Sequence, residues 1–201
     1  MMKKLMLSVG LAALVLSPLA IAEPSDREVQ QAMKRDFRAK GQAGMDRLEQ
    51  DGVQRICTAT NNKPPAALAK QLEADQLKAI VFPSGSLIGD WKNGAKIAWG
   101  GQGMQWHEDP KKAADGGCYN CHEISPQRTS AGTIGPSLRA FGKTRGNGME
   151  MQRYVYGKIY NAKAYNLCSD MPRFGPTGSL TEQQMKDLTA YLLDPTSPVN
   201  K

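Results

Sequence analysis

The chain has 201 residues, with 26 lysines and arginines against 19 aspartates and glutamates, and it contains four cysteines. This length suits one larger domain, or a small domain with an extension. The basic excess is mild and dispersed, so it does not indicate nucleic-acid binding, although it favours an acidic protein partner.

Residues 1–22 read as a cleavable secretory signal. Lys3 and Lys4 precede an apolar run, and Ala20-Ile21-Ala22 supplies the small residues expected before a cleavage site. A retained membrane anchor is the alternative, but the run from Leu5 to Leu16 is too short to span a bilayer comfortably. We therefore expect a periplasmic mature chain that begins near Glu23 and has no membrane span.

Residues 23–87 are predicted to form a helical N-terminal extension. Ser25-Asp26-Arg27-Glu28 has the capping-box pattern of a helix start. The apolar positions that follow predict one helix, or a broken pair of helices, ending near Cys57, and a second helix from about Pro65 to Leu77. The extension has few large apolar residues, so we expect it to pack against another part of the chain.

Residues 88–201 are predicted to form a second helical section with long loops. Asp90 precedes the segment WKNGAKIAW, in which Gly94 permits close approach of another helix. The last helix starts after Ser179 or Thr181 and stops before Pro195. Its apolar face consists of Met185, Leu188, Tyr191 and Leu192. Little in the chain alternates with period two, so the predicted class is all-α.

The segment GGCYNCHEI contains the motif C-x-x-C-H, the spacing of covalent c-type haem attachment. In this interpretation Cys118 and Cys121 form thioethers with the haem vinyl groups and His122 is the proximal iron ligand. The motif occurs once, which predicts one covalently bound haem c. Export to an oxidising compartment agrees with this chemistry, because c-type haem is attached there.

Two other uses of the cysteine pair are less favoured. A structural zinc site needs four ligands, and the remaining candidates, Cys57, Cys168 and His107, lie at unrelated spacings. A thioredoxin-like redox pair is expected near a βαβ pattern, and the sequence shows none.

Two downstream segments resemble parts of class I cytochromes c. GTIGPSL resembles the segment whose proline carbonyl orients the proximal histidine, which makes Pro136 the candidate, although an ordinary Gly-Pro turn is the alternative. CSDMPRFG resembles the loop that carries the sixth ligand, and Met171 is the candidate. Met149, Met151 or an open iron site remain alternatives. The resemblance also implies that the last helix crosses the first, with Gly94 and Tyr191 in contact.

The series CYNCHEI, GTIGPSL, YNAKAYNLCSDMPRFG and LTEQQMKDLTAYL is similar to SoxX, a family of monohaem cytochromes c, over roughly residues 88–195. This resemblance implies a class I cytochrome c domain and a heterodimer with SoxA. SoxAX is an L-cysteine S-thiosulfotransferase, which couples thiosulfate oxidatively to a cysteine of the carrier SoxYZ. The chain would then have no catalytic site of its own and would pass electrons to a soluble cytochrome c. A free electron carrier and a ligand-binding haem protein are the alternative functions.

Cys57 and Cys168 have no role in haem attachment, and both lie in the exported part of the chain. We expect a disulfide between them that ties the extension to the Met171 loop; the alternative is that Cys168 is a reactive thiol or an iron ligand. His107 is expected to be a solvated loop residue. Lys143 and Arg145 belong either to a haem-side or partner surface or to an ordinary solvated face.

Overall fold

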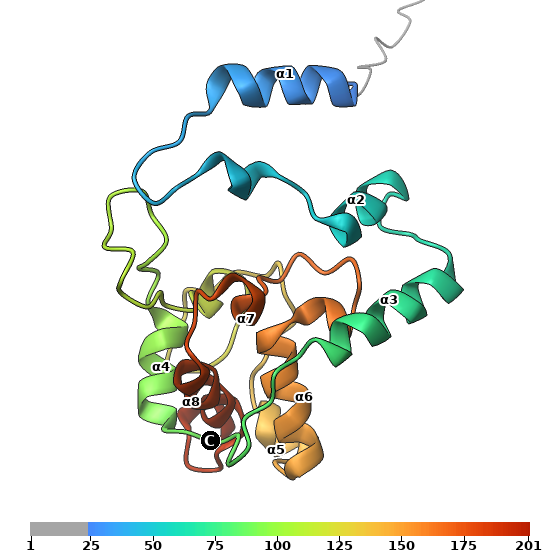
Figure 1. Ribbon diagram of the computed structural model, residues 1–201. Coiled ribbons are helices and arrows are strands. Elements are labelled where there is room, and N and C mark those ends of the chain that lie inside the picture. Colours follow the sequence, from blue (N-terminus) through green and yellow to red (C-terminus); the bar gives the residue numbers. More distant parts are fainter. Residues whose placement is uncertain (1–23) are drawn as a thin grey trace, which may run out of the picture. The chain divides into compact units, whose positions relative to one another are not determined.

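The computed structural model describes residues 24–201, and the predicted signal sequence lies outside this range. The chain divides into two compact units at Phe37 (Figure 1). The first unit contains helix α1 (Asp26–Asp36), which begins with the predicted capping box: the Glu28 carboxylate accepts a hydrogen bond from the Ser25 N–H at 2.8 Å.

The second unit, residues 38–201, contains seven α-helices and four short 3-10 helices. The α-helices are α2 (Gly52–Ala59), α3 (Ala66–Lys78), α4 (Trp91–Trp99), α5 (Phe141–Arg145), α6 (Met149–Tyr160), α7 (Phe174–Thr177) and α8 (Glu182–Leu193). The 3-10 helices are η1 (Met45–Leu48), η2 (Cys118–Asn120), η3 (Ala162–Ala164) and η4 (Pro198–Asn200). Within residues 24–201 the only β feature is an isolated bridge between Lys40 and Ala43, which confirms the predicted all-α class.

The main core forms where α4 and α6 pack on the C-terminal helix α8 (Figure 1). A Cβ atom at Gly94 would lie 2.1 Å from the Asp187 carbonyl oxygen and 2.8 Å from Tyr191 Cβ. Only glycine therefore allows the two helix backbones to approach this closely. The predicted crossing of the first and last helices of the domain, with Gly94 and Tyr191 in contact, is confirmed.

Helix α6 was not predicted from the sequence, which indicated long loops after the haem motif. Val155, Tyr156 and Ile159 of α6 are buried in the main core. The N-cap residue of this helix is Gly148, which provides no side-chain hydrogen bond, and the helix contains Gly157. Glycine lowers the intrinsic helix propensity of this segment. The helix is therefore stabilised mainly by burial of its apolar face against α8.

Helices α2 and α3 of the predicted extension belong to the same compact unit as the cytochrome-like part of the chain. Val53, Cys57 and Leu167 form a second, smaller buried cluster, against which Ala69 and Leu72 pack. The extension thus meets the segment before Met171, while a domain boundary at residue 87 stays a prediction. No helix in the described part of the chain combines the length and the apolar character needed to cross a membrane.

Candidate haem site

The C-x-x-C-H motif lies on a tight turn. Gly117 takes the left-handed conformation, with φ of 56°, and the short helix η2 follows it directly. The N–H groups of Cys121 and His122 both donate to the carbonyl oxygen of Cys118, at 3.2 and 2.9 Å. This turn fixes the spacing of the two thiols and the position of the His122 backbone.

His122 is oriented by Pro136. Its Nδ1 lies 2.7 Å from the Pro136 carbonyl oxygen. Because a carbonyl only accepts hydrogen bonds, Nδ1 carries the proton, and Nε2 keeps its lone pair free for iron. The structure thus places Pro136 where the sequence resemblance puts the orienting proline.

The segment 132–138 is held along the haem motif by three backbone hydrogen bonds. The N–H of Gly132 donates to the Tyr119 carbonyl at 2.8 Å, and the N–H of Gly135 donates to the Cys121 carbonyl at 2.8 Å. The N–H of Leu138 donates to the Glu123 carbonyl at 2.7 Å. Pro136 therefore keeps its position relative to the motif through the backbone on both sides of it.

Gly135 is a site residue that the sequence analysis did not identify. A Cβ atom there would lie 2.2 Å from Cε1 of His122 and 2.5 Å from its Nδ1. The ring of the proximal histidine therefore lies against the bare Gly135 backbone. A glycine immediately before the candidate proline, in GTIGPSL, was the available signal.

The residues around the motif fit a covalently attached haem. Cys118 and Cys121 are free thiols, whereas the other two cysteines are paired with each other. Burial raises the pKa of the Cys118 thiol to about 12, so a free thiol there stays protonated at neutral pH. Two available thiols followed by a histidine with a free Nε2 are the donor set that haem c requires. In residues 24–201, no three His, Cys, Asp or Glu side chains gather into an alternative metal site.

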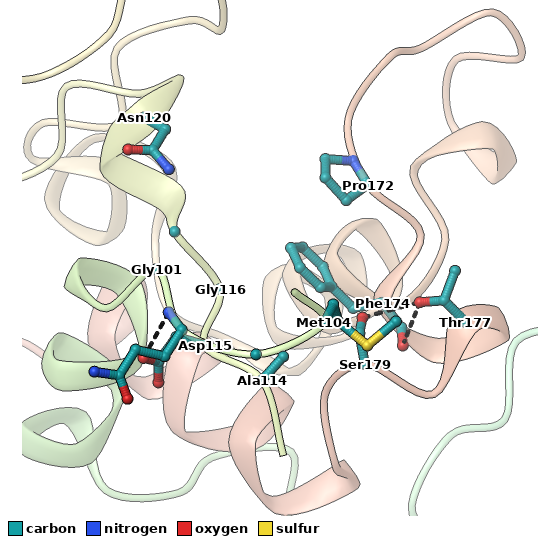
Figure 2. Close-up of a pocket in the computed structure, with 13 residues that line it drawn as sticks. Gly101, Met104, Ala114, Asp115, Gly116, Asn120, Pro172, Phe174, Thr177 and Ser179 are labelled. Carbon is teal, nitrogen blue, oxygen red and sulfur yellow. Dashed lines mark hydrogen bonds between the residues drawn. The ribbon is translucent and has the colours of Figure 1, made fainter. Parts of the chain in front are cut away.

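A pocket of about 350 Å³ lies beside the motif (Figure 2). One wall consists of glycine-rich backbone, including Gly101, Gly116 and Gly117, together with Asn120 from between the two cysteines. The opposite wall includes Pro172 and Phe174, which follow Met171 in sequence. The fold therefore brings the haem motif and the predicted ligand loop to the same hollow.

Met171 is half-buried and packs against the main core. Its N–H donates to the Ser169 hydroxyl at 3.2 Å. Of the alternative ligands, Met151 also packs on the core, whereas the side chain of Met149 is 63% exposed at the start of α6. The sixth ligand stays a prediction, with Met171 in the loop that borders the pocket.

The motif is also tied to α8 through two tyrosines. The hydroxyls of Tyr119 and Tyr191 lie 2.7 Å apart, and both side chains are buried. Burial, reinforced by the Tyr119 hydroxyl, raises the pKa of Tyr191, so the Tyr191 phenol stays neutral at physiological pH. The residue between Cys118 and Asn120 thus anchors the motif in the core.

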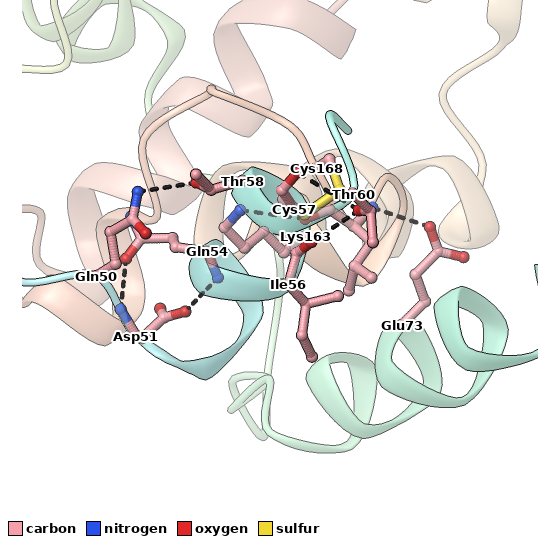
Figure 3. The surroundings of a disulfide bond; sticks show 11 residues. Gln50, Asp51, Gln54, Ile56, Cys57, Thr58, Thr60, Glu73, Lys163 and Cys168 are labelled. Carbon is pink, nitrogen blue, oxygen red and sulfur yellow. Dashed lines mark hydrogen bonds between the residues drawn. A yellow bond between two sulfur atoms is a disulfide. The ribbon is translucent and has the colours of Figure 1, made fainter. Parts of the chain in front are cut away.

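The structure joins Cys57 of α2 to Cys168 by a disulfide with an S–S distance of 2.01 Å (Figure 3). The bond spans 111 residues of sequence and lies in the small cluster beside Leu167. It fixes the chain three residues before Met171. This arrangement leaves neither cysteine as a free thiol.

The remaining predicted positions lie at the surface. His107 is exposed in a loop, where its ring contacts the edge of Trp106. Lys143 and Arg145 are exposed on the short helix α5. A haem-side or partner surface at these two residues stays a prediction.

The cytochrome c family profile matches residues 108–195, a range that contains the haem motif, Pro136 and Met171. These residues form a domain of the cytochrome c family. This family carries covalently bound haem c, and the single motif makes this chain a monohaem cytochrome.

Two individual proteins are similar to this cytochrome. One is an uncharacterized lipoprotein of Aquifex aeolicus (strain VF5), 34% identical over 155 residues, which cover 76% of this chain and 73% of the relative. The other is the crystal structure of SoxXA from P. pantotrophus, with 24% sequence identity and a TM-score of 0.40. That match covers 59% of this chain and 95% of the solved chain.

Proposed function

We propose that this cytochrome is the electron-transfer subunit of a SoxAX-type thiosulfate-oxidising complex. The observation that carries the proposal is the His122 ring oriented by the Pro136 carbonyl, together with a Met171 loop that borders the pocket beside the haem motif. A histidine and a thioether together close the iron, which suits electron transfer, whereas an open site suits ligand binding. The SoxX-like motif series supplies the proposed biological setting.

The residues of this chain have separate tasks in that function. When bound, haem c supplies a one-electron redox couple. Cys118 and Cys121 hold it covalently, and the Pro136 carbonyl keeps His122 in the tautomer and orientation that an iron ligand needs. Met171 would be the second protein ligand and would keep water and small molecules away from the iron. The chain then needs no acid, base or nucleophile of its own.

The proposed partner is SoxA, which would carry out the coupling of thiosulfate to a SoxYZ cysteine. That reaction replaces the S–H bond of the carrier cysteine by a sulfur–sulfur bond to thiosulfate and releases one proton and two electrons, and the electrons leave one at a time through haem. We propose that this chain accepts them and passes them to a soluble cytochrome c. The proposed site of action is the periplasm, reached through the signal sequence at residues 1–22.

Co-expression with a SoxA protein tests the partnership. We expect a tagged chain to co-purify a second cytochrome, and thiosulfate with SoxYZ to reduce the haem of this chain only in that complex. A chain that stays monomeric and shuttles electrons to an oxidase alone would instead be a free carrier.

The Met171→Ala variant tests the closed iron site. The ferric wild-type protein should show the weak far-red absorption band of methionine-ligated haem, and the variant should lose it. The variant should also bind carbon monoxide rapidly once reduced. Met149→Ala is the matched control, because that exposed side chain should leave both properties unchanged. A wild-type protein without the band, or one that binds carbon monoxide rapidly, would favour a ligand-binding haem protein.

A further inference from the structure

The segment that carries Met171 is attached to the N-terminal extension on both sides. Before Met171, Cys168 is bonded to Cys57 of α2. After Met171, the Arg173 guanidinium contacts the Asp51 carboxylate at 2.6 Å. Both attachments lead to the same short helix, because Asp51 is the N-cap of α2 and Cys57 lies within it.

We propose that Asp51 is a positioning residue for the sixth iron ligand: through Arg173, and together with the Cys57–Cys168 disulfide, it holds the Met171 loop closed. The inference rests on the proposed ligation by Met171. It assigns the extension a function in the redox site, beyond adding length to the domain.

Asp51 itself is held rigidly. Its Oδ1 accepts a hydrogen bond from the Gln54 N–H at 2.8 Å, and its own N–H donates to Gln54 Oε1 at 2.8 Å (Figure 3). This reciprocal capping box uses one carboxylate oxygen and leaves the other for Arg173. The ion pair therefore has a fixed acceptor, and its geometry costs less side-chain entropy than a pair between two free surface chains.

The Arg173 side chain is only 22% exposed and that of Asp51 is 37% exposed. Partial burial limits solvent screening, so this pair is stronger than an ordinary surface ion pair. Elsewhere in the described extension, Asp75 and Lys78 of α3 form an exposed pair with side chains 52% and 78% accessible. That pair provides a natural comparison, since it does not contact the Met171 loop.

The side of the loop that precedes Met171 has further polar attachments. The N–H of Leu167 donates to Glu73 of α3 at 2.9 Å, and its carbonyl accepts from the Lys163 ammonium at 3.1 Å. Leu167 is therefore fixed through both backbone groups. Four residues lie between Cys168 and Arg173, and Met171 is three residues from one attachment and two from the other.

Displacement of Met171 from iron requires this short segment to open. A ligand that binds only the open form has an apparent dissociation constant equal to its intrinsic value divided by the open fraction. Loss of the Asp51–Arg173 contact should raise the open fraction and tighten the binding of an external ligand. The effect appears at the iron, although Asp51 belongs to the extension.

Imidazole titration of the ferric holoprotein, followed by loss of the far-red band, measures this opening. Asp51→Ser is the informative variant, because serine still caps α2 through the Gln54 N–H but cannot pair with Arg173. We expect its apparent imidazole dissociation constant to fall on the order of fivefold, as for loss of a partly buried charged hydrogen bond. Asp75→Ser, the same change at the exposed pair, should match wild type.

A second pair of variants approaches the same contact from the loop. Arg173→Gln should tighten imidazole binding as Asp51→Ser does, and Arg173→Lys should largely restore the wild-type value because the charge is kept. The Cys57→Ser/Cys168→Ser variant should tighten binding further, because the other attachment is lost.

Two results would overturn the proposal, and they differ from failure of the proposed function. Asp51→Ser and Arg173→Gln could lower the melting temperature yet leave the imidazole affinity at the wild-type value; the contact would then be structural only. Asp75→Ser could change the imidazole affinity as much as Asp51→Ser does. The effect would then not be specific to the Asp51–Arg173 contact. By contrast, a far-red band missing from the wild-type protein would contradict Met171 ligation itself.

Discussion

At the scale of single residues, the environment of His122 depends on Gly135 as much as on Pro136. The imidazole ring lies against the Gly135 backbone while Nδ1 donates to the next residue's carbonyl. A side chain at position 135 would move the ring and disturb this hydrogen bond. The position of the predicted proximal ligand thus depends on a residue that has no side chain.

Gly135→Ala should therefore disturb the packing of the His122 ring and weaken its hydrogen bond to the Pro136 carbonyl. We expect a loss of roughly 1–3 kcal/mol in unfolding free energy, as for insertion of a methyl group into a packed site. The reduction potential should rise, because a weaker Nδ1–H donation makes His122 a poorer electron donor to ferric iron. Denaturant unfolding and redox titration measure the two effects. Gly85→Ala is the control, because nothing lies within 4 Å of its Cβ position; equal losses in both variants would contradict the prediction.

The Asp51 carboxylate gives a pH dependence with a defined sign. Burial acts to raise its pKa, but the Gln54 N–H and the Arg173 guanidinium outweigh burial and hold the pKa below its ordinary value of 3.8. A group whose pKa is lowered by folding stabilises the fold above the unfolded-state pKa, and this contribution disappears as pH falls through the folded-state pKa.

The stability difference between wild type and Asp51→Ser should therefore be largest at neutral pH. It should stay constant down to about pH 4 to 5 and shrink below 3.8, the ordinary pKa of this group. Thermal unfolding of both proteins across this range measures the difference, and groups common to both cancel. A difference that grows as pH falls would contradict this assignment.

At the scale of helices, the α4–α8 contact decides where the main core lies. Glycine at position 94 is unfavourable for an isolated helix, yet the crossing needs it, because a Cβ would lie 2.1 Å from the Asp187 backbone oxygen. Asp187 adds a polar attachment, since its Oδ1 accepts from the Asp90 N–H at 2.8 Å. The close backbone approach at Gly94 and the Asp90–Asp187 hydrogen bond thus both stabilise the crossing of α4 and α8.

Gly94→Ala should destabilise the protein by roughly 1–3 kcal/mol, the usual cost of overpacking. Helix propensity alone predicts the opposite sign, a gain of about 1 kcal/mol. Denaturant unfolding therefore distinguishes the two effects. Asn93→Ala, at the neighbouring exposed position of α4, should be neutral or slightly stabilising. A stabilised Gly94→Ala protein would show that the helices separate at little cost.

At the scale of the whole molecule, the disulfide links the extension to the domain across 111 residues. Its removal in Cys57→Ser/Cys168→Ser should lower the unfolding free energy by about 4–5 kcal/mol in the chain-entropy model. Denaturant unfolding of the haem-loaded proteins measures this loss. An unchanged midpoint and slope would mean that the α2 contacts hold the extension without the covalent bond.

Several features follow from sequence because they are local. The C-x-x-C-H spacing identifies the attachment site by itself, since the chemistry requires two thiols and a histidine on one turn. The capping signals at Ser25, Asp90 and Thr181 mark helix starts that the structure contains. The cysteine count also left Cys57 and Cys168 as the remaining pair.

Tertiary structure decided what depends on contacts between distant segments. Helix α6 has a weak local signal and is stabilised by burial against α8. The Asp51–Arg173 and Glu73–Leu167 contacts join residues about a hundred positions apart, and no periodic pattern encodes such pairs. The sequence thus determined the haem chemistry, which needs only neighbouring residues. The fold determined how the ligand loop is held, because that depends on which surfaces meet when the chain packs.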